Sequence, residues 1–141
     1  MADAAHKTAI ISASSSHIAG RFIIDARQNH FIADASIARG GQNEAPVATE
    51  LFVASLATCA LAVITDEAVK AGIKDASYYV DVSATQDDND GTRFSLVEFA
   101  FRFTGVKKDA AEGLVKAFTD VCPIYNTVAR ATPVKVSVSI S

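Results

Sequence analysis

The sequence predicts a mixed α+β fold that forms a single domain over residues 1–141. Three observations favour this class. Half of the residues are apolar, short strand-like stretches occur at the start, middle and end of the chain, and stretches between them have the composition of helices. The expected order of elements is β-β-β-α-β-β-α-α-β, with no internal repeat or low-complexity linker.

The first third of the chain predicts a three-stranded meander. Residues 8–12, 17–26 and 30–33 are short apolar runs, and the polar residues 14–16 and 27–29 between them are typical of turns. A Gly-rich polar loop over residues 38–46 follows and ends at Pro46. Because proline cannot lie deep inside a helix, we expect the next helix to begin beyond it.

Residues 49–72 have the length and the Ala and Leu content of a long helix, with Thr49 as a suitable N-cap and Gly72 at the end. Residues 51–64 are apolar almost all the way round. This run is shorter than the roughly 20 residues that a membrane span needs. We therefore expect protein to bury the helix on all sides, which in so small a domain indicates a partner subunit.

The second half predicts a hairpin, two helices and a last strand. Residues 78–85 alternate, residues 94–104 are rich in Phe and Val, and the acidic run 87–90 between them is read as a solvated tip. Residues 107–119 have an amphipathic pattern, 122–131 form a second helical stretch and 134–140 alternate again. The expected apolar face of the first of these helices comprises Ala110, Leu114, Val115 and Phe118.

Composition excludes several functions. The chain has thirteen basic and sixteen acidic side chains, which give a net charge of -3. This balance predicts no basic surface for binding nucleic acid or an anionic membrane. The N-terminus lacks the apolar core of a secretory signal, so we expect a cytoplasmic protein. His6, His17 and His30 have no common metal-ligand spacing, and we expect no metal site.

The two cysteines are the candidate reactive groups. Cys59 lies among apolar residues in the predicted long helix, where a thiol often serves only as a small hydrophobe. Apolar burial disfavours a thiolate, so catalysis at Cys59 requires a cation from elsewhere in the fold. Cys122 precedes Pro123, which predicts an N-cap position that stabilises a thiolate, although a core position is equally compatible. Together they suggest peroxide reduction, with a sulfenic acid on Cys59 that Cys122 converts to a disulfide.

These segments resemble the OsmC/Ohr family, named for osmotically inducible protein C and organic hydroperoxide resistance protein. The resemblance rests on ATELFVASLATC at Cys59, VCPIYNTVARATPVKVSVSI at Cys122, GGQNEAP and HFIADAS. It implies an intertwined homodimer with long central helices, curved sheets and two active sites at the subunit interface. It also implies reduction of organic hydroperoxides, with a dithiol such as a lipoyl group on a protein as reductant and no bound cofactor.

The resemblance further implies an ion pair between an arginine and a glutamate near the reactive cysteine. Glu50 matches the carboxylate, but it precedes Cys59 by nine residues where peroxidase members typically have ten. At about 100° per residue this places Glu50 on the opposite helix face, so it would serve another subunit's site or a structural role. The spacing is typical of the broader OsmC-like branch. Arg21 is the first candidate for the arginine, before Arg39 and Arg27.

Two alternatives stay open. The chain could be an OsmC-like module that binds a small molecule or lipid in an apolar pocket, with incidental cysteines. It could also be a redox sensor or holdase that forms the disulfide without turnover. We expect the phenylalanine side chains to form much of the core and to line any such pocket. They are Phe22, Phe31, Phe52, Phe94, Phe99, Phe101, Phe103 and Phe118.

Overall fold

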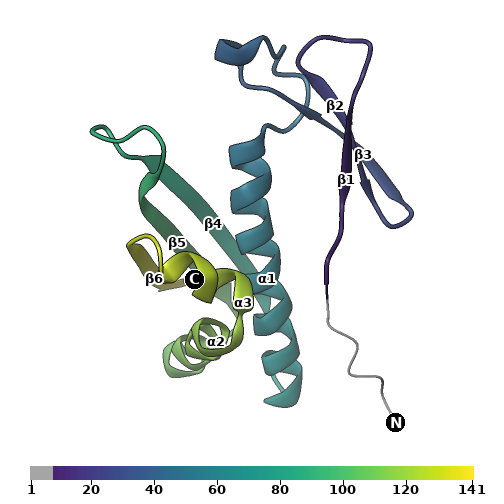
Figure 1. Cartoon of the computed structure of the whole chain (residues 1–141). Coiled ribbons are helices and arrows are strands. Elements are labelled where there is room, and N and C mark those ends of the chain that lie inside the picture. The colour runs from purple at the N-terminus through teal and green to yellow at the C-terminus, as the bar shows by residue number, and fades with distance from the viewer. Residues whose placement is uncertain (1–7) are drawn as a thin grey trace. The chain divides into compact units, whose positions relative to one another are not determined.

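The computed structural model describes residues 8–141, which divide into two compact units, one ending at Leu51 and the other beginning at Phe52 (Figure 1). It confirms the mixed α+β class. The elements in chain order are β1 (Ser12–Ser15), β2 (Arg21–Ala26), β3 (Asn29–Asp34), the 3-10 helix η1 (Ile37–Arg39), α1 (Ala48–Lys70), β4 (Ser77–Gln86), β5 (Phe94–Thr104), α2 (Lys108–Val121), α3 (Pro123–Ala129) and β6 (Val134–Ile140).

The N-terminal unit contains an antiparallel meander in the order β1-β2-β3. Its first strand lies later than the predicted residues 8–12, because two of the serines that suggested a turn pair with β2: Ser14 lies opposite Ile23 and Ser15 opposite Phe22. Strand pairing satisfies their backbone groups, which outweighs the turn preference of serine. The turn follows instead, where Ser16 Oγ accepts from the Ile18 N–H and Gly20 takes a φ of 77°.

The C-terminal unit contains a mixed sheet in the order β4-β5-β6. β4 and β5 form the expected antiparallel hairpin, and β6 pairs parallel to β5. A parallel neighbour requires a crossover, which α2 and α3 provide. The acidic tip of the hairpin is ordered by its own side chains, since Asp87 accepts from the Asn89 N–H and from Arg93.

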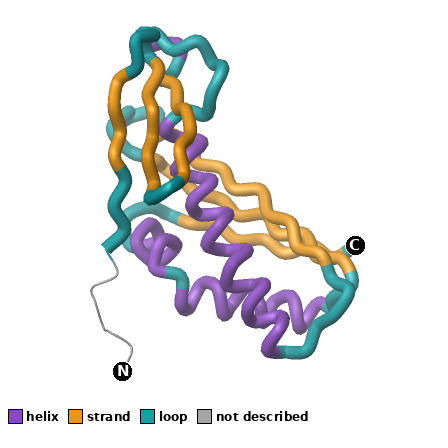
Figure 2. Tube along the Cα trace, turned by 90° about the vertical axis from the view of Figure 1, so that its right-hand side faces the viewer, coloured by secondary structure: helices purple, strands orange, loops and turns teal. Residues whose placement is uncertain are grey.

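One face of β5 forms the core. Val97, Phe99, Phe101 and Phe103 alternate with exposed residues, and α1 and α2 pack against their face (Figure 2). The buried face of α2 consists of Ala111, Leu114, Val115 and Phe118, so Ala111 replaces the predicted Ala110. The prediction of Ala110 was wrong by one residue, which corresponds to a rotation of about 100° around the helix axis.

Helix α1 buries only one stripe within the chain. Leu56, Ala60, Ile64 and Ala68 recur every four residues and are buried, whereas Val69 is exposed. The expected burial on all sides is therefore not reached within one chain. The helix is also longer than the apolar run: over 23 residues, with a mean hydropathy of 1.8 in its most apolar part, it has the length and composition of a membrane span. The core helix of a globular protein can share both properties.

Candidate functional site

The structure joins the two cysteines in a disulfide. Cys59 lies in α1 and Cys122 immediately before α3, and their Cα atoms are 6.6 Å apart. This separation is within the range of about 4.4–6.8 Å that a disulfide spans. The fold thus brings together two residues separated by 63 positions in the chain.

The surroundings of the two sulfur atoms differ. Cys122 is fully buried, whereas Cys59 is only partly buried at the edge of the core. Cys122 is the N-cap of α3, as Pro123 predicted, and its Sγ accepts a hydrogen bond from the Tyr125 N–H at 3.4 Å. When the disulfide is reduced, the same N–H can stabilise a thiolate on Cys122.

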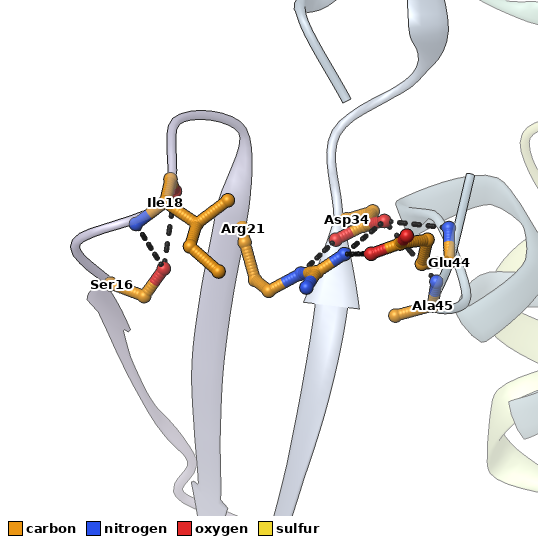
Figure 3. A network of polar contacts seen from close by, with 6 residues as sticks. All are labelled: Ser16, Ile18, Arg21, Asp34, Glu44 and Ala45. Atoms are coloured by element: carbon orange, nitrogen blue, oxygen red, sulfur yellow. Dashed lines mark hydrogen bonds and ion pairs between the residues drawn. The ribbon is translucent and has the colours of Figure 1, made fainter. Parts of the chain in front are cut away.

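Arg21 is held by two carboxylates in the N-terminal unit (Figure 3). Its Nε donates to Asp34 Oδ1 at 3.0 Å, and its Nη2 donates to Glu44. Asp34 is 3% exposed and also accepts from the backbone N–H groups of Glu44 at 2.9 Å and Ala45 at 3.2 Å. The polar network therefore fastens the loop before α1 to strand β3.

The charges of this network stabilise one another. The Arg21 guanidinium, followed by the Glu44 amide, lowers the pKa of Asp34 below its ordinary value. Asp34, followed by Glu44, raises the pKa of Arg21 above its already high ordinary value. Both side chains are therefore ionised at neutral pH, and the guanidinium is largely neutralised by its carboxylate partners.

Within the chain, the hydrogen-bond partner of Glu50 is a backbone group. Its Oε2 accepts from the Val47 N–H at 2.9 Å, which caps the start of α1. Within residues 8–141, Arg21 pairs with Asp34 and Glu44 and not with Glu50. Sequence reasoning did not single out Asp34 and Glu44, although both lie in the segments HFIADAS and GGQNEAP. The signal for Asp34 is the strand register, which places it directly opposite Arg21.

The other candidates lie in the same unit. Arg39 ends η1 and is exposed, and Arg27 occupies the turn between β2 and β3 with a φ of 60°. His30 Nδ1 lies 2.5 Å from Asp25 Oδ1 across the same strand pair. The roles of Arg21, Arg27 and Arg39 towards Cys59 stay predictions.

We predict that Asp34→Asn releases the loop before α1. The pKa of Asp34 in the folded protein lies below its unfolded value of about 3.9. The Asp34 carboxylate therefore stabilises the folded loop above about pH 3.9, and this stabilisation is lost as the pH falls through the folded-state pKa. At pH 7 the amide protons of Glu44 and Ala45 should exchange faster in the variant, as measured by NMR. Below about pH 4 the wild type should approach the variant.

Asp25→Asn is the matched control, because Asp25 bonds His30 on the same sheet and not this loop. Equal acceleration at Glu44 and Ala45 in both variants would contradict the role of Asp34.

Comparisons with known proteins agree with the fold. The sequence profile of the family described as OsmC-like protein matches residues 41–137. No curated protein matches the sequence.

Solved structures of three bacterial proteins align over nearly the full chain. An organic hydroperoxide resistance protein from Legionella pneumophila is 25% identical, with a TM-score of 0.66, and the alignment covers 94% of this chain and 96% of that one. An organic hydroperoxide resistance protein from Elizabethkingia anophelis is 23% identical, with a TM-score of 0.73, and the alignment covers 95% of this chain and 96% of that one. The organic hydroperoxide resistance protein OhrB of Bacillus subtilis is 24% identical, with a TM-score of 0.67, and the alignment covers 94% of this chain and 98% of that one.

The profile match covers most of the chain and includes both cysteines and the helix that carries Cys59. The chain belongs to the OsmC-like protein family.

Proposed function

We propose that this protein is a thiol peroxidase that reduces organic hydroperoxides to alcohols. The observation that carries the proposal is the bond between Cys59 and Cys122, two cysteines distant in sequence, in a member of the OsmC-like family. The structural similarity to organic hydroperoxide resistance proteins supports the substrate class.

The difference in burial supports separate roles for the two thiols. Cys59 is partly exposed and accessible to a substrate, whereas Cys122 is fully buried. In the proposed reaction the Cys59 thiolate attacks the distal oxygen of ROOH, the O–O bond breaks, and ROH leaves after taking up a proton. Cys122 then attacks the Cys59 sulfenic acid, forming the disulfide and releasing water. A dithiol reduces the disulfide and is itself oxidised.

The compartment follows from this cycle. A disulfide that must be reduced at every turnover requires a reducing environment, which supports a cytoplasmic location and a dithiol reductant such as a lipoylated protein. Neither the oxidation nor the reduction requires a bound cofactor.

Each cysteine variant should have its own kinetic signature. With cumene hydroperoxide as substrate and dihydrolipoamide as reductant, we expect Cys59→Ser to lose activity to background, because no peroxide-reactive thiol is left. In the absence of the dithiol, Cys122→Ser should consume about one equivalent of peroxide and retain a sulfenic acid that dimedone labels.

Hydrogen peroxide is the substrate control, and we expect slower reduction of it than of cumene hydroperoxide. Equal background rates for the wild type and Cys59→Ser would rule out the peroxidase.

We further propose that Arg21 stabilises the Cys59 thiolate. Asp34 and Glu44 orient the Arg21 guanidinium, and Glu50 supports the site by capping α1. Arg21→Gln should then slow the oxidation of Cys59 at pH 7 by at least about tenfold, as loss of one charge-assisted contact implies. The rate should recover at higher pH, where the thiol ionises without help. The measurement is the second-order rate constant with cumene hydroperoxide as a function of pH.

Arg27→Gln is the control, since Arg27 lies in the turn between β2 and β3. A pH profile for Arg21→Gln that coincides with that of the wild type would assign Arg21 a purely structural role.

We also propose that the protein is a homodimer. The side of α1 opposite its buried stripe carries Leu61, Ala62 and Val69, which line a shallow surface hollow. The N-terminal sheet exposes Ile23 and Ile32, with exposed fractions of 38% and 40%. A second copy of the chain would cover this apolar surface, as the resemblance to the family implies.

Leu61→Glu should weaken the dimer, because a carboxylate in a dry helix interface has no partner. We expect the dissociation constant to rise at least tenfold, by about 1.4 kcal/mol or more, as measured by analytical ultracentrifugation. Gly113→Glu adds the same charge on α2, where a Cβ atom meets nothing within 4 Å, and should leave the dimer intact. A monomeric wild type would refute the dimer outright.

A further inference from the structure

The junction between α2 and α3 contains a break in the backbone at Cys122. α2 ends at Val121, and Cys122 leaves the helical conformation, with a φ of -72° and a ψ of 115°, before Pro123 begins α3. In a continuous helix the carbonyl oxygen of Thr119 would accept from the backbone N–H four residues later. That residue is Pro123, which has no N–H, so the carbonyl group of Thr119 needs another donor.

The side chain of Asn126 supplies this donor. Its Nδ2 donates to the carbonyl oxygen of Thr119 at 3.0 Å and to that of Cys122 at 2.9 Å. The side-chain amide has two N–H groups, which is enough for both bonds. One part-buried amide therefore joins the last turn of α2 to the start of α3, and one of its two attachment points is Cys122 itself.

The distance between the cysteines leaves little tolerance for movement of Cys122. The two Cα atoms are 6.6 Å apart, whereas a disulfide usually spans at most about 6.8 Å. A small displacement of Cys122 away from α1 would therefore prevent the bond from closing without strain. Rotation of the backbone at the break between α2 and α3 would cause such a displacement, and the bridge made by Asn126 opposes this rotation.

We propose that Asn126 is a positioning residue for the resolving step, in which Cys122 reacts with the sulfenic acid on Cys59. In that step the Cys122 sulfur attacks the Cys59 sulfur, the S–O bond breaks, and the hydroxyl group leaves as water with the proton of the Cys122 thiol. The side chain of Asn126 bonds to backbone carbonyl groups, so it acts through the position of Cys122 and not on the reacting atoms. The inference deepens the proposed peroxidase function and rests on it.

The two steps of oxidation are measured separately in Asn126→Ala. Reduced protein is mixed with one equivalent of cumene hydroperoxide, quenched with acid at successive times and weighed by mass spectrometry, since the sulfenic acid and the disulfide differ in mass by one water. We expect Cys59 to react at the wild-type rate, because the substitution lies outside α1. Disulfide formation should slow by at least about tenfold, because a small misplacement of a reacting group has effects of this size.

Thr127→Ala is the matched control. Thr127 Oγ1 donates to the Pro123 carbonyl oxygen at 2.7 Å, so the variant also loses a side-chain bond of α3, but one that stays within α3. It should form the disulfide at the wild-type rate. Equal slowing in Asn126→Ala and Thr127→Ala would show a general loosening of α3 and would overturn the proposal. A wild-type rate of disulfide formation in Asn126→Ala would do so as well.

Asn126→Thr separates the bridge to α2 from the bond within α3. A threonine hydroxyl has one hydrogen and can serve only one of the two carbonyl groups. The carbonyl group four residues back, that of Cys122, is the one that it should choose, because Thr127 makes the equivalent bond to Pro123. We expect Asn126→Thr to form the disulfide as slowly as Asn126→Ala. A wild-type rate would show that the link to Thr119 has no role, and this variant also decides the question if Asn126→Ala does not fold.

Thiol–disulfide exchange with glutathione tests the position of Cys122 without any peroxide. In mixtures of reduced and oxidised glutathione, we expect the equilibrium constant for the bond between Cys59 and Cys122 to fall at least about tenfold in Asn126→Ala and to stay unchanged in Thr127→Ala. Alkylation of the free thiols followed by mass spectrometry measures it. A wild type that does not reduce cumene hydroperoxide would refute the peroxidase alone, whereas an unchanged equilibrium constant in Asn126→Ala would refute the role of Asn126.

Discussion

Packing of one face of β5 against α1 and α2 determines where the two cysteines lie. Phe99 contacts Phe118 and Tyr125, with ring centroids 5.5 Å and 5.7 Å away. Cys122 lies between these two residues in sequence, at the break between α2 and α3. Aromatic pairs of this kind each contribute about 0.5–1.5 kcal/mol beyond the burial of their area. The position of Cys122 is therefore maintained by an aromatic cluster of the core.

Cys59 is placed by the same core through a different element. It immediately precedes Ala60, which belongs to the buried stripe of α1. One residue along a helix turns about 100°, so Cys59 lies at the border between the buried stripe and the exposed side. This border position leaves the thiol partly accessible while keeping it within bonding distance of Cys122. A residue in the middle of the stripe would be inaccessible to a peroxide, and one on the outer side would be out of reach of Cys122.

Sequence patterns anticipate the C-terminal unit better than the N-terminal one. The alternation of β4 and β5 and the proline after Cys122 are local signals, and the structure agrees with the hairpin and with the N-cap. The first strand was misplaced because its sequence, SASS, is polar and its pairing with β2 is not local. The partners of Arg21 were missed for a similar reason: Asp34 and Glu44 lie 13 and 23 positions away, and only the fold brings them together.

The proposed dimer would bury apolar surface that stays exposed in each unit of a single chain. The N-terminal meander is apolar on both faces, with Phe22 and Phe31 on one side and Ile23 and Ile32 on the other. A unit of this size, near the lower limit of about 40 residues for independent folding, cannot bury two apolar faces by itself. A second copy would complete it, and it would also cover the exposed side of α1. In such an assembly a cysteine pair and an arginine network that belong to different units of one chain can be supplied by different copies. That arrangement would also explain why the spacing of Glu50 and Cys59 places them on opposite faces of the same helix.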